Sequence, residues 1–328
     1  MKTRNLYLLL IAFMAVACIT KNENADKKLS LLERAEIPYL KGESRKAFDA
    51  KPSPDFDKNK WFTNDHCLIE DKEGTLHWFG INNPYPPKGK GLYSYHPYLG
   101  HLKTTDPQKE WERLPMALNE INGTEYVGAP YVVWHEESKR YAMVVEVWPK
   151  DRELEVYWSD DLYNWEPSGV YLTGDVWKST RDPHIMKGSD GKYWIHCVSH
   201  GVEGKKRSQV IRWKTKDFIH FEPAQEVLGI DDNNWATLME SPFLVERNGL
   251  WYMFFTYAHR RYAETIVVVS DNSDHFDYKK NTLTTMFGHA MEIFTYKGKQ
   301  YATSCGPEDK HYLNHQSVSI AELGWLKQ

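Results

Sequence analysis

The chain has 328 residues and a formal net charge of -4 at pH 7, from 41 Lys and Arg against 45 Asp and Glu. This charge is too small and too evenly spread along the chain to suggest a nucleic-acid-binding protein, and we expect no nucleic-acid partner. Aromatic residues make up 14% of the chain, which favours β-strands and also provides flat faces that can stack on sugar rings.

The chain begins with the features of an export signal. Lys2 and Arg4 precede an apolar run over residues 6–17, which is too short to span a bilayer. Small residues at positions 15–17 lie directly before Cys18, and this order resembles a bacterial lipobox, in which the Cys is lipidated and becomes the first mature residue. We therefore expect a signal peptide over residues 1–17 and an exported periplasmic or outer-membrane lipoprotein. Plain secretion after the same cleavage is the alternative.

Residues 18–45 are polar and charged and are typical of a tether, which can end in a strand that helps to close the following domain. No further stretch is apolar and long enough to cross a membrane, so a lipid on Cys18 would be the only anchor. Three more cysteines, Cys67, Cys197 and Cys305, show no metal-site or disulfide-framework spacing. We expect buried thiols, and one disulfide remains open.

Two motifs then alternate along residues 46–328. A polar turn followed by an apolar strand occurs over residues 73–80, 137–146, 189–199, 247–257 and 296–306, with turn positions at Gly74, Ser138, Gly191, Gly249 and Gly298. The second motif, with Ser or Thr third and an aromatic residue ninth, occurs over residues 103–111, 157–165, 213–221, 268–276 and 317–325. A period of about 50 residues with little helical patterning predicts one all-β domain, a five-bladed β-propeller. A two-sheet sandwich is the alternative.

Acidic residues recur where the blades should face the central channel. Counting nine residues back from each turn position gives Asp65, Ala129, Asp182, Glu240 and His289. A single acid there would be ordinary turn chemistry, but converging carboxylates repel one another and cost folding free energy. Three of them in one register therefore indicate function, and paired carboxylates are what glycoside hydrolysis requires.

Three sequence blocks resemble the signature blocks of glycoside hydrolase families 43 and 32. They are residues 61–65 (WFTND), 180–184 (TRDPH) and 239–242 (MESP). Those families share a five-bladed propeller with an Asp, Asp, Glu site. The resemblance implies that Asp65 is the base or nucleophile, that Asp182 stabilises the transition state and modulates the acid's pKa, and that Glu240 is the general acid.

The blocks are closer to family 43. Family 32 usually shows Asn-Asp-Pro-Asn-Gly and Glu-Cys, whereas this chain has NDHC at residues 64–67 and Glu240-Ser241. A family-43-like enzyme would invert the anomeric configuration with Asp65 as base, and a closer relation to family 32 would make Asp65 a nucleophile and retain it. For inversion we expect a raised pKa for Glu240 and an Asp65 that is ionised at neutral pH.

Other residues are candidates for the pocket wall. Arg181 adjoins Asp182 and is expected either to hold it ionised or to bind sugar hydroxyls. His289 resembles a family-43 histidine that can lie beside a central metal ion, so it is a candidate calcium neighbour, although we expect no cofactor to be required. The substrate-binding candidates are Asn64, Trp134, Arg181, His184, His200, Tyr257 and His259.

The sequence therefore predicts a monomeric glycoside hydrolase that acts on pentose- or furanose-containing oligo- or polysaccharides, of arabinofuranosidase or xylosidase type. The alternatives are a retaining fructosidase of the family 32 type, a phosphorylase in which phosphate replaces the base, and a non-catalytic sugar-binding propeller. Sugar, linkage and anomer depend on pocket loops that the motifs do not specify.

Overall fold

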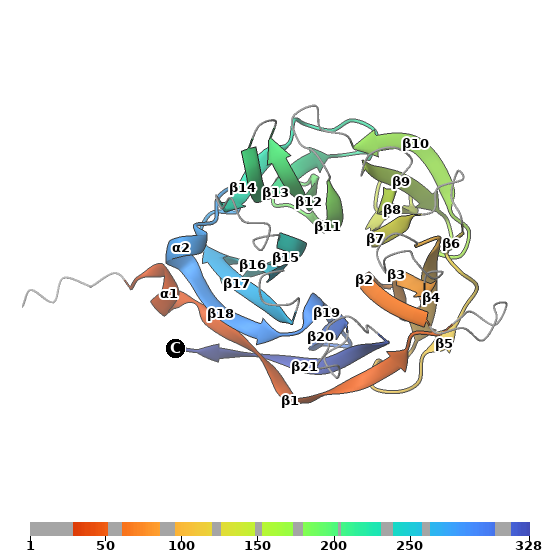
Figure 1. Cartoon of the computed structure of the whole chain (residues 1–328), viewed down its shortest axis with the longest axis horizontal. Coiled ribbons are helices and arrows are strands. Elements are labelled where there is room, and N and C mark those ends of the chain that lie inside the picture. Colours follow the sequence, from red (N-terminus) through yellow and green to blue (C-terminus); the bar gives the residue numbers. More distant parts are fainter. Residues whose placement is uncertain are drawn as a thin grey trace, which may run out of the picture.

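The computed structural model describes residues 29–51, 61–85, 96–119, 126–147, 153–172, 180–202, 205–230, 239–257, 263–305 and 316–328, and at 200–202, 205–207 and 257 the backbone alone. The predicted signal peptide, Cys18 and His259 lie outside these residues. The described chain forms five antiparallel sheets around a central axis (Figure 1). This is a five-bladed β-propeller, and the fold prediction is confirmed.

Each blade runs outward from an innermost strand at the axis. The first blade contains β2 (Trp61–Glu70), β3 (Leu76–Pro84), β4 (Tyr98–Thr104) and β5 (Glu112–Arg113), with β6 (Leu118–Asn119) also paired to β4. The second contains β7 (Val127–His135), β8 (Arg140–Val147), β9 (Glu153–Ser159) and β10 (Glu166–Leu172). The third contains β11 (Arg181–Lys187), β12 (Tyr193–Val202), β13 (Lys205–Thr215) and β14 (Gln225–Ile230). The fourth contains β15 (Met239–Arg247), β16 (Leu250–Tyr257), β17 (Glu264–Ser270) and β18 (Thr282–Phe287).

The fifth blade joins the two ends of the described chain. It contains β19 (His289–Tyr296), β20 (Lys299–Cys305) and β21 (Ser317–Lys327), and its outer strand is the N-terminal β1 (Glu36–Asp49). β1 pairs with β21 from Glu36 opposite Lys327 to Asp49 opposite Ser317, which closes the ring by joining the N-terminal strand to the C-terminal blade. The closing strand thus begins within the stretch that the sequence marks as a tether. Two single-turn helices, α1 (Leu31–Arg34) and α2 (Tyr278–Asn281), lie on the periphery.

The hairpin turns lie at the predicted positions. In the fourth and fifth blades they are two-residue turns, Asn248-Gly249 and Lys297-Gly298, whose residues all have positive φ. Two positive φ values are what the hairpin-forming type I′ turn needs, and Gly adopts them without steric cost. In the first and third blades the hairpin loops are longer, between the pairs Glu70–Leu76 and Lys187–Tyr193.

Every innermost strand is bulged at the same level, near its entry from the pocket side. The pairing register shifts between Thr63 and His66, Gly128 and Tyr131, Arg181 and His184, Glu240 and Phe243, and His289 and Glu292. The first residue of four of these bulges has positive φ: Ala129, Asp182, Ser241 and Ala290. A bulge redirects side chains, and positive φ in a non-Gly residue is backbone strain of the kind found at functional sites.

The bulges correct one part of the sequence interpretation. Counting from the turns put Asp65, Asp182 and Glu240 at one equivalent position, and this is wrong. Glu240 is the last paired residue before its bulge, Asp182 is the first residue inside its bulge, and Asp65 is the second. The count failed because the hairpin loops differ in length from blade to blade.

The core lies between the blades. Apolar side chains of neighbouring sheets pack together, as Phe62 and Phe79 do with Met143 and Val145. The second strand of each blade also packs on the innermost strand of the next: β3 on β7, β8 on β11, β12 on β15, β16 on β19 and β20 on β2. Cys67, Cys197 and Cys305 are buried free thiols within this core, as expected.

Candidate active site

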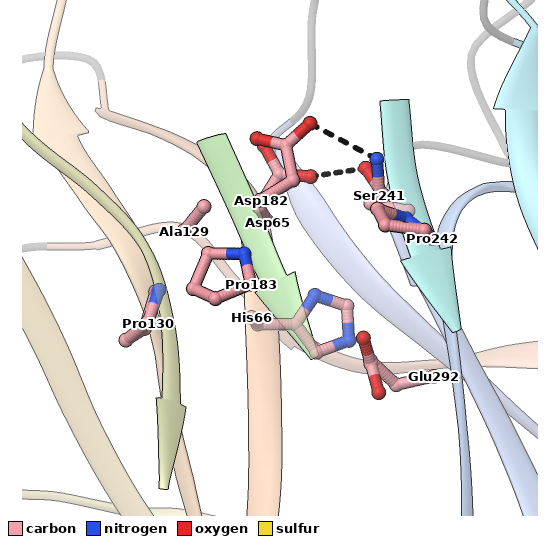
Figure 2. A pocket seen from close by; sticks show the side chains of 10 residues that line it. Asp65, His66, Ala129, Pro130, Asp182, Pro183, Ser241, Pro242 and Glu292 are labelled. Atoms are coloured by element: carbon pink, nitrogen blue, oxygen red, sulfur yellow. Dashed lines mark hydrogen bonds between the residues drawn. The ribbon is translucent and has the colours of Figure 1, made fainter. Parts of the chain in front are cut away.

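All five blades contribute to one small cavity on the propeller axis. Its lining residues are Asp65 and His66 from β2, Ala129 and Pro130 from β7, Asp182 and Pro183 from β11, Ser241 and Pro242 from β15, and Ala290 and Glu292 from β19 (Figure 2). The volume of this cavity is about 10 Å³, which is roughly the space that one water molecule needs. The three lining prolines occupy the second bulge position, which is unpaired in the strand ladder, so their missing N–H costs no hydrogen bond.

Ser241 connects two of the three predicted acids. Its hydroxyl donates to Asp65 Oδ1 at 2.5 Å, and its backbone N–H donates to Asp182 Oδ2 at 3.0 Å (Figure 2). Both donations come from a residue whose φ of 49° belongs to the left-handed region. Ser241 was not among the predicted site residues, although its place directly after Glu240 in the signature block was a signal for it.

Arg181 connects the third acid to the same group. Its Nη2 donates to Glu240 Oε1 at 2.6 Å, and its Nε lies 3.6 Å from Asp182 Oδ2. Burial disfavours the charge of this guanidinium, but the carboxylates of Glu240, Asp182 and Glu146 outweigh that cost and raise the Arg181 pKa. Arg181 is therefore a permanent cation among acids.

Asp65 has an unusual titration. Burial, and after it the charge of Glu240, raises the pKa of Asp65 to about 6, while the Ser241 hydrogen bond and Arg181 act in the opposite direction. A carboxyl with this pKa is largely ionised at pH 7 but takes up a proton within the mildly acidic range. Such a group can accept a proton from water and release it again near neutral pH.

Asn64, directly before Asp65, is held by side chains of the fifth blade. His289 Nε2 lies 2.7 Å from Asn64 Oδ1, and Cys305 Sγ donates to the Asn64 carbonyl oxygen at 3.1 Å. His66 bonds Thr303 through Nε2 at 2.8 Å, and burial lowers the His66 pKa to about 4. These contacts hold the chain immediately before and after Asp65.

Two predicted substrate contacts lie elsewhere. Trp134 lies near the hairpin end of β7, away from the bulge, where its ring packs on Tyr141 and beneath the Lys72 ammonium at 3.9 Å. The prediction that Trp134 lines the pocket is therefore wrong, because it counted proximity in sequence and not position along the strand. His184 is buried below the cavity, its ring 4.4 Å from that of Phe243. It packs in the layer under the acids instead of facing a substrate.

The remaining predicted residues are described only in part. His200 and Tyr257 lie on β12 and β16, with their backbones described and their side chains outside the description, and His259 lies outside the described residues.

Two further buried acids near the site, Glu146 and Glu292, were not predicted from the sequence. Glu292 reaches the cavity from β19, and burial followed by the charge of Asp65 raises its pKa well above the ordinary value. Glu146 lies on β8 with 1% of its surface exposed. Its signal was a carboxylate at the end of an otherwise apolar strand, residues 141–147.

Direct metal coordination does not fit this arrangement. Within the described residues, no group of three or more His, Cys, Asp or Glu side chains is placed to hold a metal ion. The Nε2 of His289, the predicted metal neighbour, is directed at Asn64. We derive no catalytic step through a metal. No helix of the described chain is long and apolar enough to cross a bilayer.

No protein-family model matches this sequence, and no curated protein matches it. Solved structures do match the fold. A family 43 β-xylosidase/α-arabinofuranosidase from a compost microbial metagenome, solved with xylotriose in a calcium-free form, has a TM-score of 0.62 and 15% identity, covering 87% of this chain and 95% of its own. An endo-arabinase from Bacteroides thetaiotaomicron has a TM-score of 0.62 and 15% identity, covering 80% of this chain and 94% of its own.

A family 43 enzyme from Xanthomonas citri, solved with xylose, has a TM-score of 0.62 and 13% identity, covering 86% of this chain and 90% of its own. The described chain therefore has the same five-bladed architecture as glycoside hydrolases of family 43, over nearly the whole length of those proteins.

Proposed function

We propose that this protein is a glycoside hydrolase that cleaves pentose- or furanose-containing oligo- or polysaccharides, of arabinofuranosidase or xylosidase type. The observation that carries the proposal is the linkage of Asp65, Asp182 and Glu240 at the propeller axis by Ser241 and Arg181. Asp65 and Asp182 line the small cavity, and Glu240 is joined to them through Arg181. Such a group of carboxylates matches the needs of glycoside hydrolysis. The similarity in fold to xylosidases and an arabinanase supports the substrate class.

In this proposal Asp65 is the general base. Its pKa of about 6 leaves it ionised at neutral pH, and the cavity beside it has room for one water molecule. Asp65 takes a proton from the attacking water, and the water oxygen bonds to the anomeric carbon from the face opposite the leaving group. The product then has inverted configuration.

Asp182 stabilises the positive charge that develops on the sugar ring. The Ser241 N–H and the Arg181 guanidinium hold its carboxylate in place. Because these donors are set by the bulges before substrate arrives, no reorganisation is needed when the charge appears.

Glu240 is the general acid that protonates the leaving oxygen. In the free protein it accepts a hydrogen bond from Arg181, which stabilises its ionised form. The sequence predicts a raised pKa for Glu240, and this hydrogen bond acts in the opposite direction. The proposal therefore requires that bound substrate weakens the Arg181–Glu240 pair, so that Glu240 carries its proton when the glycosidic bond breaks.

We further propose that the protein is exported and held to a membrane by a lipid on Cys18, acts as a monomer and needs no cofactor. The order of charged, apolar and small residues before Cys18 supports the anchor. A calcium ion in the central channel would have to be held largely by water, because the described residues offer no ligand group of their own.

A panel of nitrophenyl glycosides tests the proposed function. We expect release of nitrophenol from α-L-arabinofuranoside or β-D-xyloside and not from hexopyranosides. Selective turnover of a fructoside would instead indicate a family-32-like enzyme. Binding of pentosides without turnover would mean that the site is not catalytic.

A further inference from the structure

Glu146 is a buried acid that the catalytic scheme above does not use. It lies on β8, the second strand of the second blade, and is 1% exposed. It pairs with Gly128, the last residue before the bulge of β7. The bulge of that blade carries Ala129 and Pro130, so its innermost strand brings no acid to the cavity.

The blade repeat shows where a side chain at this position points. Thr256 is the equivalent residue of the fourth blade, paired with Glu240, and its hydroxyl accepts the backbone N–H of Ala290 in the next blade at 3.0 Å. Cys305 is the equivalent residue of the fifth blade, and it donates to the Asn64 carbonyl oxygen in the next blade at 3.1 Å. In both cases the partner is the first residue of the next blade's bulge.

The same position in the second blade faces the bulge of the third. β8 packs on β11, so Glu146 is directed at Arg181 and Asp182. The electrostatics agree with this placement, because the charge of Glu146 raises the pKa of Arg181, of Asp65 and of Cys197 on β12. A buried carboxylate that stays ionised is stabilised by a cation or by hydrogen-bond donors, and among the groups on which Glu146 acts the Arg181 guanidinium is the cation.

We propose that Glu146 is a positioning residue of the hydrolytic site, which holds the Arg181 guanidinium and thereby limits how much of its positive charge acts on Glu240. This inference rests on the proposed function for its consequence in catalysis. Without Glu146, Arg181 would be shared by Asp182 and Glu240 alone and would oppose protonation of the general acid more strongly.

The ionisable surroundings determine the sign of the effect. In the described chain, the charge of Glu146 acts on Arg181 from β11, Asp65 from β2 and Cys197 from β12. Asp182 from β11, Glu240 from β15 and Tyr126 directly before β7 act on the same Arg181. Only Arg181 among them is a cation. Removing the Glu146 charge makes the whole site less negative, which favours the ionised form of every acid in it.

The test is the pH dependence of hydrolysis by Glu146→Gln. The acidic limb of kcat/KM should move to lower pH because Asp65 loses a negative neighbour. The alkaline limb should move the same way because the acid gives up its proton more easily. We expect each limb to move by about half a pH unit or more. A purely structural role would lower activity at every pH and leave both limbs in place.

Glu155→Gln is the matched control. Glu155 is also 1% exposed and lies on β9 of the same blade, but it accepts its hydrogen bond from the Tyr157 hydroxyl at 2.7 Å. This variant should keep the wild-type pH profile. If Glu146→Gln fails to fold, Glu146→Asp retracts the charge without removing it and should move both limbs in the same direction by less.

A second readout separates this inference from the proposed function. The carboxyl carbon of Asp65 can be titrated by NMR without any substrate, and the pKa of about 6 in the wild type should fall in Glu146→Gln. If wild-type protein hydrolyses no pentoside, the proposed function fails, and this titration still decides the placement of Glu146. An unchanged Asp65 titration together with unchanged limbs would overturn the inference.

Discussion

The guanidinium of Arg181 donates a hydrogen bond to the Glu240 carboxylate at 2.6 Å, across the junction of two blades. The residue proposed as general acid thus accepts a hydrogen bond from a permanent cation before substrate binds. Ser241 holds Asp65 and Asp182 from the other side. For Glu240 to act as the acid, substrate binding must therefore change the partner of Arg181.

Asp65→Asn should abolish hydrolysis, with a loss of at least about 1,000-fold in kcat on all substrates, because the amide cannot take the proton from the attacking water. In the wild type, kcat/KM should fall as the pH drops through about 6, where Asp65 becomes protonated. A pH–rate profile of the wild type and an activity assay of the variant check both statements. Residual turnover within about tenfold of the wild type would show that Asp65 is not the base.

The same substitution should stabilise the folded protein at neutral pH. The pKa of Asp65 is raised from 3.8 to about 6, so ionisation costs stability as the pH rises through this window and the full cost persists above it. Asp65→Asn should add up to about 3 kcal/mol to the free energy of unfolding at pH 7.5 and almost nothing at pH 3.5. Urea denaturation at the two pH values measures this, and a variant that is less stable at both would contradict the placement of Asp65.

Ser241→Ala should move the acidic limb of the pH profile upward. The Ser241 hydroxyl lowers the pKa of Asp65, so its loss leaves Asp65 protonated at higher pH. Activity should drop several-fold at pH 6 and stay close to wild type at pH 8, since the backbone N–H to Asp182 remains. Ser159→Ala is the control, because it removes a buried hydroxyl from a turn of the second blade and should leave the limb unmoved.

Glu240→Ala should reduce turnover of natural oligosaccharides far more than that of activated aryl glycosides. An activated phenol leaves without a proton, whereas a sugar alcohol needs one. We expect a difference of about 100-fold or more between the two losses. Steady-state kinetics on a nitrophenyl pentoside and on the matching disaccharide measure it. Equal losses on both substrates would remove Glu240 from the role of acid.

The sequence predicted the five blades correctly, and the structure links the three predicted acids at the axis, because each prediction rests on a local signal that repeats. The spacing of the turns indicates the number of blades, and carboxylates near the starts of the innermost strands indicate the site. The prediction that the three acids occupy equivalent positions failed because it depends on the lengths of the hairpin loops, which the spacing of turn residues does not give. Asp65, Asp182 and Glu240 are offset by single positions because the Glu70–Leu76 and Arg247–Leu250 hairpins differ in length.

The Pro residues of three bulges mark the structurally equivalent positions of their innermost strands. Pro130, Pro183 and Pro242 occupy the same structural position, and an alignment on them would have placed Ser241 opposite Asp182. Glu146 could not be found in this way, because it comes from a second strand and reaches the neighbouring blade. Only the packing of β8 on β11 reveals its direction.

Cys18→Ala should release the protein from membranes or block its processing, because the thioether to the lipid can no longer form. Fractionation of cells that express the wild type and the variant, followed by immunoblotting, measures the change. Both proteins keep Cys67, whose thiol is buried, so a difference in fractionation between them is due to Cys18. Continued membrane association of Cys18→Ala would exclude the lipid anchor.

The configuration of the first product tests the central claim most directly. Wild-type protein is mixed with a nitrophenyl pentoside in an NMR tube, and the anomeric proton of the released sugar is followed before mutarotation. The proposed roles of Asp65 as base and Glu240 as acid predict that the first sugar released has the anomeric configuration opposite to that of the substrate. Release with retained configuration, or no release of sugar from any pentoside, would contradict this account.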